Sequence, residues 1–196
     1  MRKNNPQAKN GEIRIIAGQW RSRKLKVADG EGLRPTTDRV RETLFNWLQF
    51  DIASSICLDA CAGSGALGFE ALSRGAAAVH FVEKNDKALT VLRENSRQFV
   101  LEKQQNIHIH HDSIEQFLSR PSQVKHTFDI VFVDPPYKAK LHNAIFIALL
   151  ENHWLSEKAL IYCETPVNEK LELPNSWQFT RKKNFKNFSF GLIEVG

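Results

Sequence analysis

Short apolar runs alternate along the chain with segments whose apolar residues recur at helical spacing. The runs predict strands, which we expect near residues 56–60, 78–83, 107–111, 128–133 and 158–164. The intervening segments predict helices, which we expect near residues 66–74, 86–100, 113–119 and 141–152. Strands that alternate with helices in this way indicate an α/β fold with a parallel, doubly wound sheet and right-handed crossovers.

The residues before the first of these strands carry two further patterns. Apolar residues on either side of Gly18 predict a small β-hairpin, on which we expect Trp20 to be exposed. Thr36-Thr37-Asp38 then supplies an N-cap for a helix near residues 39–48. Its buried face is predicted to consist of the apolar residues at helical spacing, which are Val40, Leu44, Phe45 and Leu48.

That helical face leaves Arg39 and Arg41 pointing elsewhere, either as surface charges or as contacts to RNA phosphate or to a cofactor carboxylate. At the other end of the chain, residues 177–195 predict a closing hairpin. We therefore divide the chain into an extension of hairpin plus helix, residues 1–52, and a main domain, residues 53–196.

A carboxylate stands at the end of each of four predicted strands: Asp59, Glu83, Asp112 and Asp134. In an open α/β sheet, ligands bind at the carboxyl ends of the strands. Four carboxylates placed there by chance is improbable, so we expect them to line one ligand site.

The first of these strands continues into a glycine turn. Gly63, Gly65 and Gly68 have the spacing G-x-G-x-x-G, which by itself favours a dinucleotide with its pyrophosphate at the helix N-terminus. Asp59 would oppose a pyrophosphate and favours a cationic ligand, such as the sulfonium or ammonium end of S-adenosylmethionine. Glu83, 18 positions after Gly65, is near the spacing at which an acidic residue meets ribose hydroxyls.

Asp112 could accept a hydrogen bond from an adenine amino group, but a helix N-cap at Asp112 or Ser113 is an equally good interpretation. Both can be true. The expected cofactor site then comprises Asp59, Ala60, Gly63, Gly65, Glu83, Asp112 and Ser113.

Asp134-Pro135-Pro136-Tyr137 is the most specific motif in the chain. The Asp134 side chain and the Pro135 carbonyl can both accept hydrogen bonds from an exocyclic amino group. The two prolines restrict the backbone, and Tyr137 offers a face on which a base can stack. A plain strand-ending turn is the simpler alternative. These four residues are the expected catalytic site.

Charge is distributed unevenly. The net charge is +5, yet residues 1–27 carry +7 and the remainder −2, which indicates a polyanionic partner bound through phosphates. A membrane surface fits less well, because the basic segment is not an amphipathic helix. The candidate RNA-binding residues are Arg14, Arg21, Arg23, Lys24, Lys26, Arg34 and Arg39.

Three cysteines without C-x-x-C spacing indicate a reducing cytosol and no structural zinc, so we expect a cytoplasmic protein. The strand histidines His108, His110 and His111 do not converge on one face, and we expect no metal. No long apolar run predicts a membrane span. Oligomeric state is open, with a monomer as our expectation.

These motifs together resemble the bacterial RsmD family. The strand-end motifs come in the order found in S-adenosylmethionine-dependent methyltransferases that act on amino groups, and the flanks narrow the resemblance. The flanking segments are Arg14–Gly18, Leu33–Glu42, Phe45–Leu48 and Gly65–Ala76.

The resemblance implies a Rossmann-like, seven-stranded, mostly parallel sheet with helices on both faces and one antiparallel strand in the tail. It also implies methyl transfer to the N2 amino group of a guanine in 16S ribosomal RNA, either naked or in the assembling 30S subunit.

Three other functions remain to be weighed against this one. An adenine-N6 methyltransferase acting on DNA would use Asp134-Pro135-Pro136-Tyr137 equally well. A nicotinamide-dependent oxidoreductase is favoured only by the glycine spacing and Glu83. A non-catalytic RNA-binding module would rest on the basic segment alone, and it has no use for the strand-end carboxylates.

Overall fold

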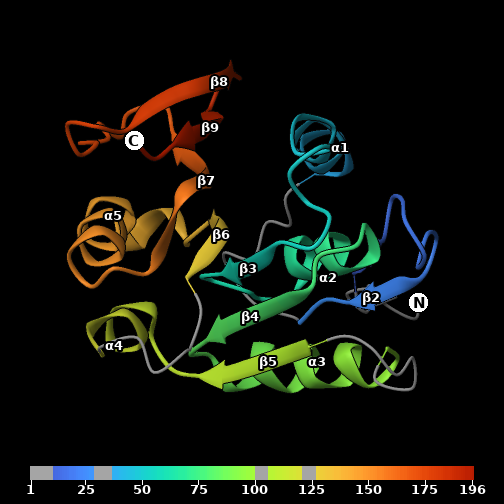
Figure 1. Cartoon of the computed structure of the whole chain (residues 1–196). Coiled ribbons are helices and arrows are strands. Elements are labelled where there is room, and N and C mark those ends of the chain that lie inside the picture. The colour runs from blue at the N-terminus through green and yellow to red at the C-terminus, as the bar shows by residue number, and fades with distance from the viewer. Residues whose placement is uncertain (1–10, 29–36, 100–105, 121–126) are drawn as a thin grey trace, which may run out of the picture.

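The computed structural model describes residues 11–28, 37–99, 106–120 and 127–196. Arg34 and the first ten residues lie outside these ranges. The core of the fold is a seven-stranded sheet of order β5-β4-β3-β6-β7-β9-β8 (Figure 1). Its strands are β3 (Ile56–Asp59), β4 (Ala78–Glu83), β5 (Asn106–His111), β6 (Phe128–Val133), β7 (Leu155–Pro166), β8 (Gln178–Asn184) and β9 (Phe188–Glu194).

The predicted Rossmann-like fold is confirmed. The five strands from β3 to β7 pair in parallel, and β9 runs antiparallel between β7 and β8. The antiparallel strand therefore lies in the tail, as expected. Strand β7 begins at Leu155 rather than near 158, because Leu155 pairs with Phe128 across a register shift.

Helices cover both faces of the sheet, and one apolar cluster lies on each face. The helices are α1 (Asp38–Trp47), α2 (Ala66–Ser73), α3 (Asp86–Arg97), α4 (Ile114–Ser119) and α5 (His142–Glu151), with a short 3-10 turn η1 (Tyr137–Ala139). Side chains of α1, α2 and α3 contribute to one cluster, and those of α4 and α5 to the other. Within the described residues, no helix is long and apolar enough to cross a membrane.

The predicted N-terminal hairpin is present as β1 (Glu12–Arg14) and β2 (Lys24–Lys26). The expectation that Trp20 is exposed was wrong, because only 1% of its surface is accessible. Its ring stacks on Phe99 with centroids 4.0 Å apart. Ile13 and Leu25 are buried in the same cluster, so the hairpin packs into the core rather than projecting from it.

Helix α1 buries the four apolar residues that its spacing predicts, but it buries Arg41 as well. The expectation that Arg41 points away from the core was wrong. Its Nη2 donates to the Arg14 carbonyl at 2.8 Å and to Asp38 Oδ1 at 2.7 Å. The hairpin backbone covers this flank of α1 and encloses the guanidinium, a contact that helical periodicity cannot predict.

Glu70 of α2 joins the same buried network. Its carboxylate accepts from the backbone N–H groups of Ile16 and Ala17 at 2.7 and 3.1 Å and from Arg74 Nε at 2.7 Å. Arg41 Nη1 lies 3.9 Å from Glu70 Oε2, with both side chains fully buried. This carboxylate therefore ties the hairpin, α1 and α2 together.

We expect Glu70→Ala to lower the free energy of unfolding by about 3–5 kcal/mol, because it removes a buried counter-charge of Arg41 and the acceptor of the Ile16 and Ala17 N–H groups. Urea denaturation followed by circular dichroism measures this change. The matched control is Glu42→Ala on the exposed side of α1, which should change stability by no more than about 0.5 kcal/mol. A loss below about 1 kcal/mol for Glu70→Ala would show that the network does not hold the hairpin.

Candidate active site

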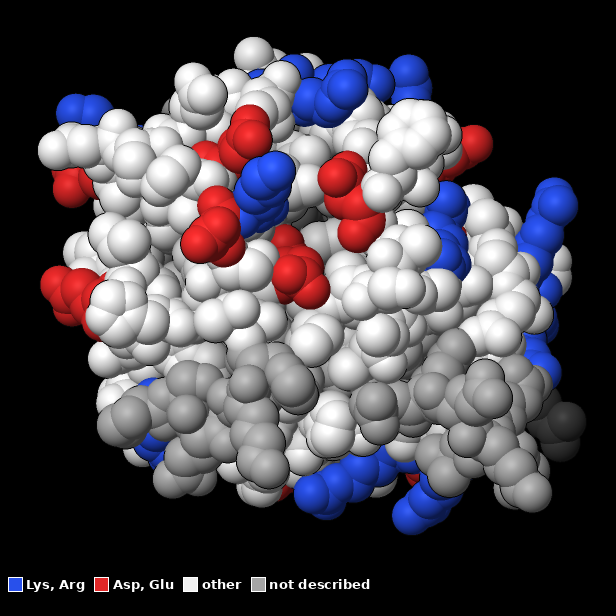
Figure 2. All heavy atoms as spheres, in the orientation of Figure 1, with Lys and Arg blue, Asp and Glu red and all other residues white. Residues whose placement is uncertain are grey.

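The four predicted strand-end carboxylates line one edge of the sheet. Asp59 and Glu83 are the last residues of β3 and β4, while Asp112 and Asp134 directly follow β5 and β6. These four strands are parallel neighbours, so their carboxyl ends share one edge (Figure 1). Figure 2 shows several acidic side chains in the upper middle of one face, with one basic side chain among them and further basic side chains along the top, right-hand and lower margins.

Cys61, which follows β3, lies within the electrostatic influence of three of these carboxylates. Burial raises the pKa of its thiol well above the ordinary value, and the negative charges of Asp59, Glu83 and Asp134 raise it further. The thiol is therefore protonated at neutral pH. A protonated thiol is a poor nucleophile, so the Cys61 side chain is suited to packing rather than to covalent catalysis.

Asp59 is 97% buried and accepts a hydrogen bond from the Gly68 N–H at 3.0 Å. That contact supports the first turn of α2, whose N-cap residue is Gly65 and offers no side chain. Burial raises the pKa of Asp59 to about 7; the Gly68 hydrogen bond opposes the rise and the charge of Glu83 adds to it. A positive group placed beside Asp59 would restore its ionised form.

The glycine turn is held in place by Glu83. Its Oε2 accepts from the Gly63 N–H at 2.8 Å, and its Oε1 accepts from the Asn85 N–H at 2.7 Å. Gly65 has φ +79°, and a Cβ there would lie 2.5 Å from the Phe69 ring, so a side chain would be strained and crowded. Glu83 keeps further lone pairs for hydroxyl donors, because each carboxylate oxygen accepts more than one hydrogen bond.

Asn95 of α3 fastens the glycine turn from the other side, a role that the sequence did not reveal. Its Nδ2 donates to the carbonyls of Ser64 and Lys26, both at 2.9 Å, and its Oδ1 accepts from the Lys26 N–H at 2.9 Å. The amide is fully buried. It therefore couples the turn to the N-terminal hairpin.

At the end of β5 the N-cap interpretation is confirmed for Ser113, whose Oγ accepts from the Gln116 N–H at 3.2 Å and begins α4. Asp112 accepts from the Ser113 N–H at 3.0 Å and pairs with Arg120 at 2.6 Å. These contacts orient the Asp112 carboxylate at the strand edge. Its predicted contact with an adenine amino group stays a prediction.

The Asp134-Pro135-Pro136-Tyr137 motif leaves β6 and enters η1. Pro135 is buried and Asp134 half-buried, while Tyr137 has 37% of its surface accessible. The Tyr137 hydroxyl donates a short hydrogen bond to Glu164 Oε1. This bond anchors the ring at one end and leaves part of its surface open to solvent.

Glu164, near the end of β7, is a residue that sequence reasoning missed. Its other oxygen, Oε2, accepts from Tyr162 at 3.4 Å. Burial raises the pKa of Tyr162 well above its ordinary value, and the nearby charges of Asp134 and Glu164 add to the rise. Tyr162 therefore remains a donor. The strand-end rule could have found Glu164, because the predicted strand 158–164 ends on it.

His142 supports Glu164 from α5. Its Nε2 lies 2.8 Å from the Glu164 carbonyl oxygen, and its Nδ1 lies 2.8 Å from Glu169 Oε1. The ring is fully buried. Together with Tyr137 and Tyr162, His142 fixes the end of β7 beside Asp134.

The candidate RNA-binding residues fall into two groups. Arg14, Arg21 and Arg39 are exposed. Lys24, Lys26 and Arg23 already have partners in Glu12 at 2.6 Å, Glu94 at 3.0 Å and the Gln98 carbonyl at 3.3 Å. The hairpin cations are thus partly neutralised.

The histidines of β4 and β5 stack on one another. His80 packs against His108 and His110 with ring centroids 4.3 and 5.3 Å apart, and its Nδ1 lies 3.1 Å from His110 Nε2. Over the described ranges, no group of three or more His, Cys, Asp or Glu side chains could hold a metal ion. The three rings pack against one another across β4 and β5.

Comparison with known proteins places this chain in a family. The family model described as Conserved hypothetical protein 95 matches residues 13–193. Ribosomal RNA small subunit methyltransferase D of Haemophilus influenzae is 46% identical over 96% of this chain and 96% of its own. The Escherichia coli K12 protein of the same name is 45% identical over 94% of this chain and 91% of its own.

A solved structure agrees. The Escherichia coli protein yhhF superposes with a TM-score of 0.84 at 40% identity, covering 94% of this chain and 98% of that one. The similarity spans nearly the whole of each protein. The chain belongs to the ribosomal RNA small subunit methyltransferase D (RsmD) family.

Proposed function

We propose that this chain transfers a methyl group from S-adenosylmethionine to the exocyclic N2 amino group of a guanine in 16S ribosomal RNA. Family membership supports the coarser statement, that the chain is an S-adenosylmethionine-dependent methyltransferase of small-subunit ribosomal RNA. Asp134, the Pro135 carbonyl and Tyr137 form a clamp at the end of β6, which supports an exocyclic amino group as the target, and the RsmD relationship supports guanine N2 over adenine N6. There Asp134 and a partly exposed Tyr137 ring, anchored on Glu164, stand beside the glycine turn.

The residues present fit the methyl donor. The half-buried Glu83 carboxylate meets the glycine turn and suits ribose hydroxyls, and Asp112 at the neighbouring strand end suits an adenine amino group. Asp59, buried at the strand end between them and Asp134, suits a positive charge. S-adenosylmethionine supplies an electrophilic methyl group on a sulfonium.

The clamp orients the target base. Asp134 and the Pro135 carbonyl accept hydrogen bonds from the two N–H groups of the amino group, which draws the nitrogen lone pair out of conjugation and aims it at the methyl carbon. A new N–C bond forms as the C–S bond breaks in line. The methylated nitrogen then loses one proton, to Asp134 or directly to water. Much of the rate should come from holding two reactants in this geometry.

The target base must leave any helix that contains it. An amino group buried in a duplex cannot reach the strand-end edge, so the base is unpaired or flipped out. Tyr137 provides the stacking face, and its bond to Glu164 holds the ring ready before the base arrives. We further propose that residues 1–52 act as an RNA-contacting extension, with the hairpin fastened to the glycine turn through Asn95.

The direct test is incubation with labelled S-adenosylmethionine and either undermethylated 30S particles or naked 16S ribosomal RNA, followed by nucleoside analysis. Label in N2-methylguanosine supports the proposal, and the better of the two substrates identifies the assembly stage. Label in N6-methyladenosine, or stronger transfer to a DNA duplex than to either RNA substrate, would replace it with adenine methylation.

We expect Asp134→Ala to reduce the rate of methyl transfer by about 100-fold or more, because the amino group loses its orienting acceptor. Cofactor affinity, measured by calorimetry, should stay largely unchanged. Asp134→Asn keeps an acceptor oxygen without the charge, so activity retained in it would assign Asp134 to orientation rather than proton transfer. Asp51→Ala, an exposed carboxylate before β3, is the control. Normal turnover in Asp134→Ala would remove the clamp from the mechanism.

We also expect cofactor affinity to depend on pH through Asp59. Its pKa is about 7 in the free protein, so the carboxyl is mostly protonated at pH 6. A bound positive charge favours the ionised form and lowers that pKa, so binding releases a proton. Affinity should therefore rise with pH by up to about tenfold per unit until the pH passes the pKa of the free protein.

Calorimetry at pH 6 in two buffers of different ionisation enthalpy measures the released proton. Asp59→Asn keeps an acceptor for the Gly68 N–H and is the matched control, in which the pH dependence should disappear. Proton release that persists in Asp59→Asn would assign the titration to another group.

A further inference from the structure

The edge strand β8 and its turn carry an unusual charge pattern. Residues 178–187 include four cationic side chains and no acidic one. The four cations are all exposed, and they are Arg181, Lys182, Lys183 and Lys186. Within the part of the chain that the structure describes, no ion pair joins them to an acid, whereas Lys24 and Lys26 of the hairpin are both paired. Figure 2 shows basic side chains along the top margin, where Figure 1 places β8.

Sheet register places this strand end beside the active site. Asp134 follows Val133, which pairs with Cys163 of β7. In the next row, Glu164 pairs with Phe190 of β9, and Phe190 pairs with Lys183 of β8. Lys183 is therefore three strands from β6, about 14 Å at the usual spacing of neighbouring strands. The β8–β9 turn emerges at the same sheet edge as Asp134.

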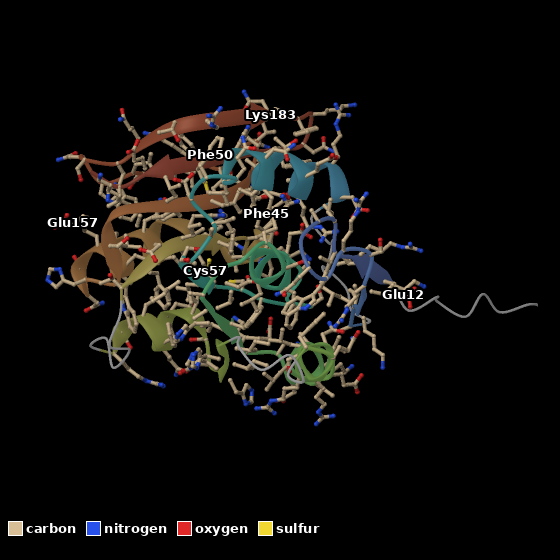
Figure 3. The ribbon with its side chains drawn as sticks, turned by 45° about the vertical axis from the view of Figure 1, so that its right-hand side comes forward. Glu12, Phe45, Phe50, Cys57, Glu157 and Lys183 are labelled. Atoms are coloured by element: carbon tan, nitrogen blue, oxygen red, sulfur yellow. The ribbon has the colours of Figure 1, made fainter. Side chains whose placement is uncertain are left out.

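Aromatic rings accompany these cations. Phe185, in the turn, has 36% of its surface accessible. It stacks on Phe188, with centroids 4.8 Å apart and planes at 3°, and on Phe190 at 5.8 Å. The Lys183 amino group lies 5.9 Å from the Trp47 ring centroid, and Figure 3 shows Lys183 on β8 above α1. A pile of rings held by the fold presents a rigid face on which a base can stack.

Charged edge strands also have a simpler explanation, because lysines on an edge prevent pairing with other sheets. Edge protection, however, does not require an exposed aromatic turn or a position in the row that leads to Asp134. Here every charge has the same sign, an aromatic turn is present, and the row leads to Asp134. Binding of a nucleic-acid strand accounts for all three observations, because phosphates complement the cations and a base can stack on the ring.

We propose that β8 and the β8–β9 turn bind the substrate RNA backbone on one side of the target nucleotide. Arg181, Lys183 and Lys186 contact phosphates, and the Phe185 ring stacks a nearby unpaired base. This surface is separate from the N-terminal hairpin, which lies on a different side of the molecule in Figures 1 and 3. The inference rests on the proposed function, because it takes the base at Asp134 to belong to RNA.

The test is a triple variant, Arg181→Gln, Lys183→Gln and Lys186→Gln. Lys182 is left unchanged because it packs over Phe179 on the other side of the strand, 4.9 Å from its ring centroid. Filter binding to 16S ribosomal RNA across a salt series should give weaker binding than wild type. The plot of log affinity against log salt should flatten by up to about two units, from three lost phosphate contacts at roughly 0.7 each.

The matched control removes three exposed cations elsewhere, with Arg93→Gln and Arg97→Gln on α3 and Lys158→Gln in the first half of β7. It should bind RNA nearly as wild type does. Cofactor affinity should be unchanged in both triples. Equal losses of RNA affinity in the two triples, or wild-type affinity and slope in the β8 triple, would overturn the proposal.

Stacking is tested separately from charge. Phe185→Ala should weaken RNA binding by about tenfold without changing the salt slope, while Phe185→Tyr keeps the ring and should bind normally. Equal binding by both variants would remove the stacking role. Failure of the proposed function would give a different result. Wild-type protein would then form no N2-methylguanosine, irrespective of the RNA affinities of the β8 variants.

Discussion

The parallel pairing of β5, β4, β3 and β6 is the constraint on which the rest of this structure depends. Parallel strands end at a common edge, so four carboxylates widely separated in the sequence become neighbours. Their proximity and burial change the protonation of the groups at this edge. Burial and mutual repulsion raise the pKa of Asp59 to about 7 and keep the Cys61 thiol protonated. A sheet edge with surplus negative charge is prepared for a cationic cofactor and for amino groups.

The structure supports that edge from both sides. On one side, Asn95 and Glu83 hold the glycine turn, and Glu70 fastens the hairpin to α2. On the other, His142 and Glu164 hold the Tyr137 ring beside Asp134. Side chains that are held by buried hydrogen bonds need little reorganisation when substrates bind. Methyl transfer benefits from this rigidity, because its rate depends on holding the two reactants in the reactive geometry.

Much of this architecture could be predicted from the sequence, because strand and helix periodicity is local. The alternation of elements, the buried face of α1 and the strand-end positions of the four carboxylates were all confirmed. The errors concern contacts between distant segments. Trp20 is buried by Phe99, and Arg41 is enclosed by the hairpin backbone, and neither partner is visible in a helical or strand pattern.

Site residues with a local sequence motif could likewise be predicted, whereas those whose role depends on contacts between distant segments could not. The two prolines after Asp134 marked it as a candidate site residue, and the position of Ser113 before a predicted helix marked it as an N-cap. Glu164 was overlooked although it ends a predicted strand, because no motif surrounds it. Asn95 had no sequence signal, since its role arises only where α3 meets both the hairpin and the glycine turn. The roles of the predicted site residues in cofactor binding and RNA binding stay predictions.

The most direct measurement is a crystal structure of the chain with S-adenosylhomocysteine bound. Our account predicts that the ribose lies at Glu83, the adenine near Asp112, and the sulfur between Asp59 and Asp134, facing the open side of the Tyr137 ring. An adenosine bound away from the carboxyl ends of β3 to β6, or a sulfur directed away from Asp134, would contradict the single-edge site.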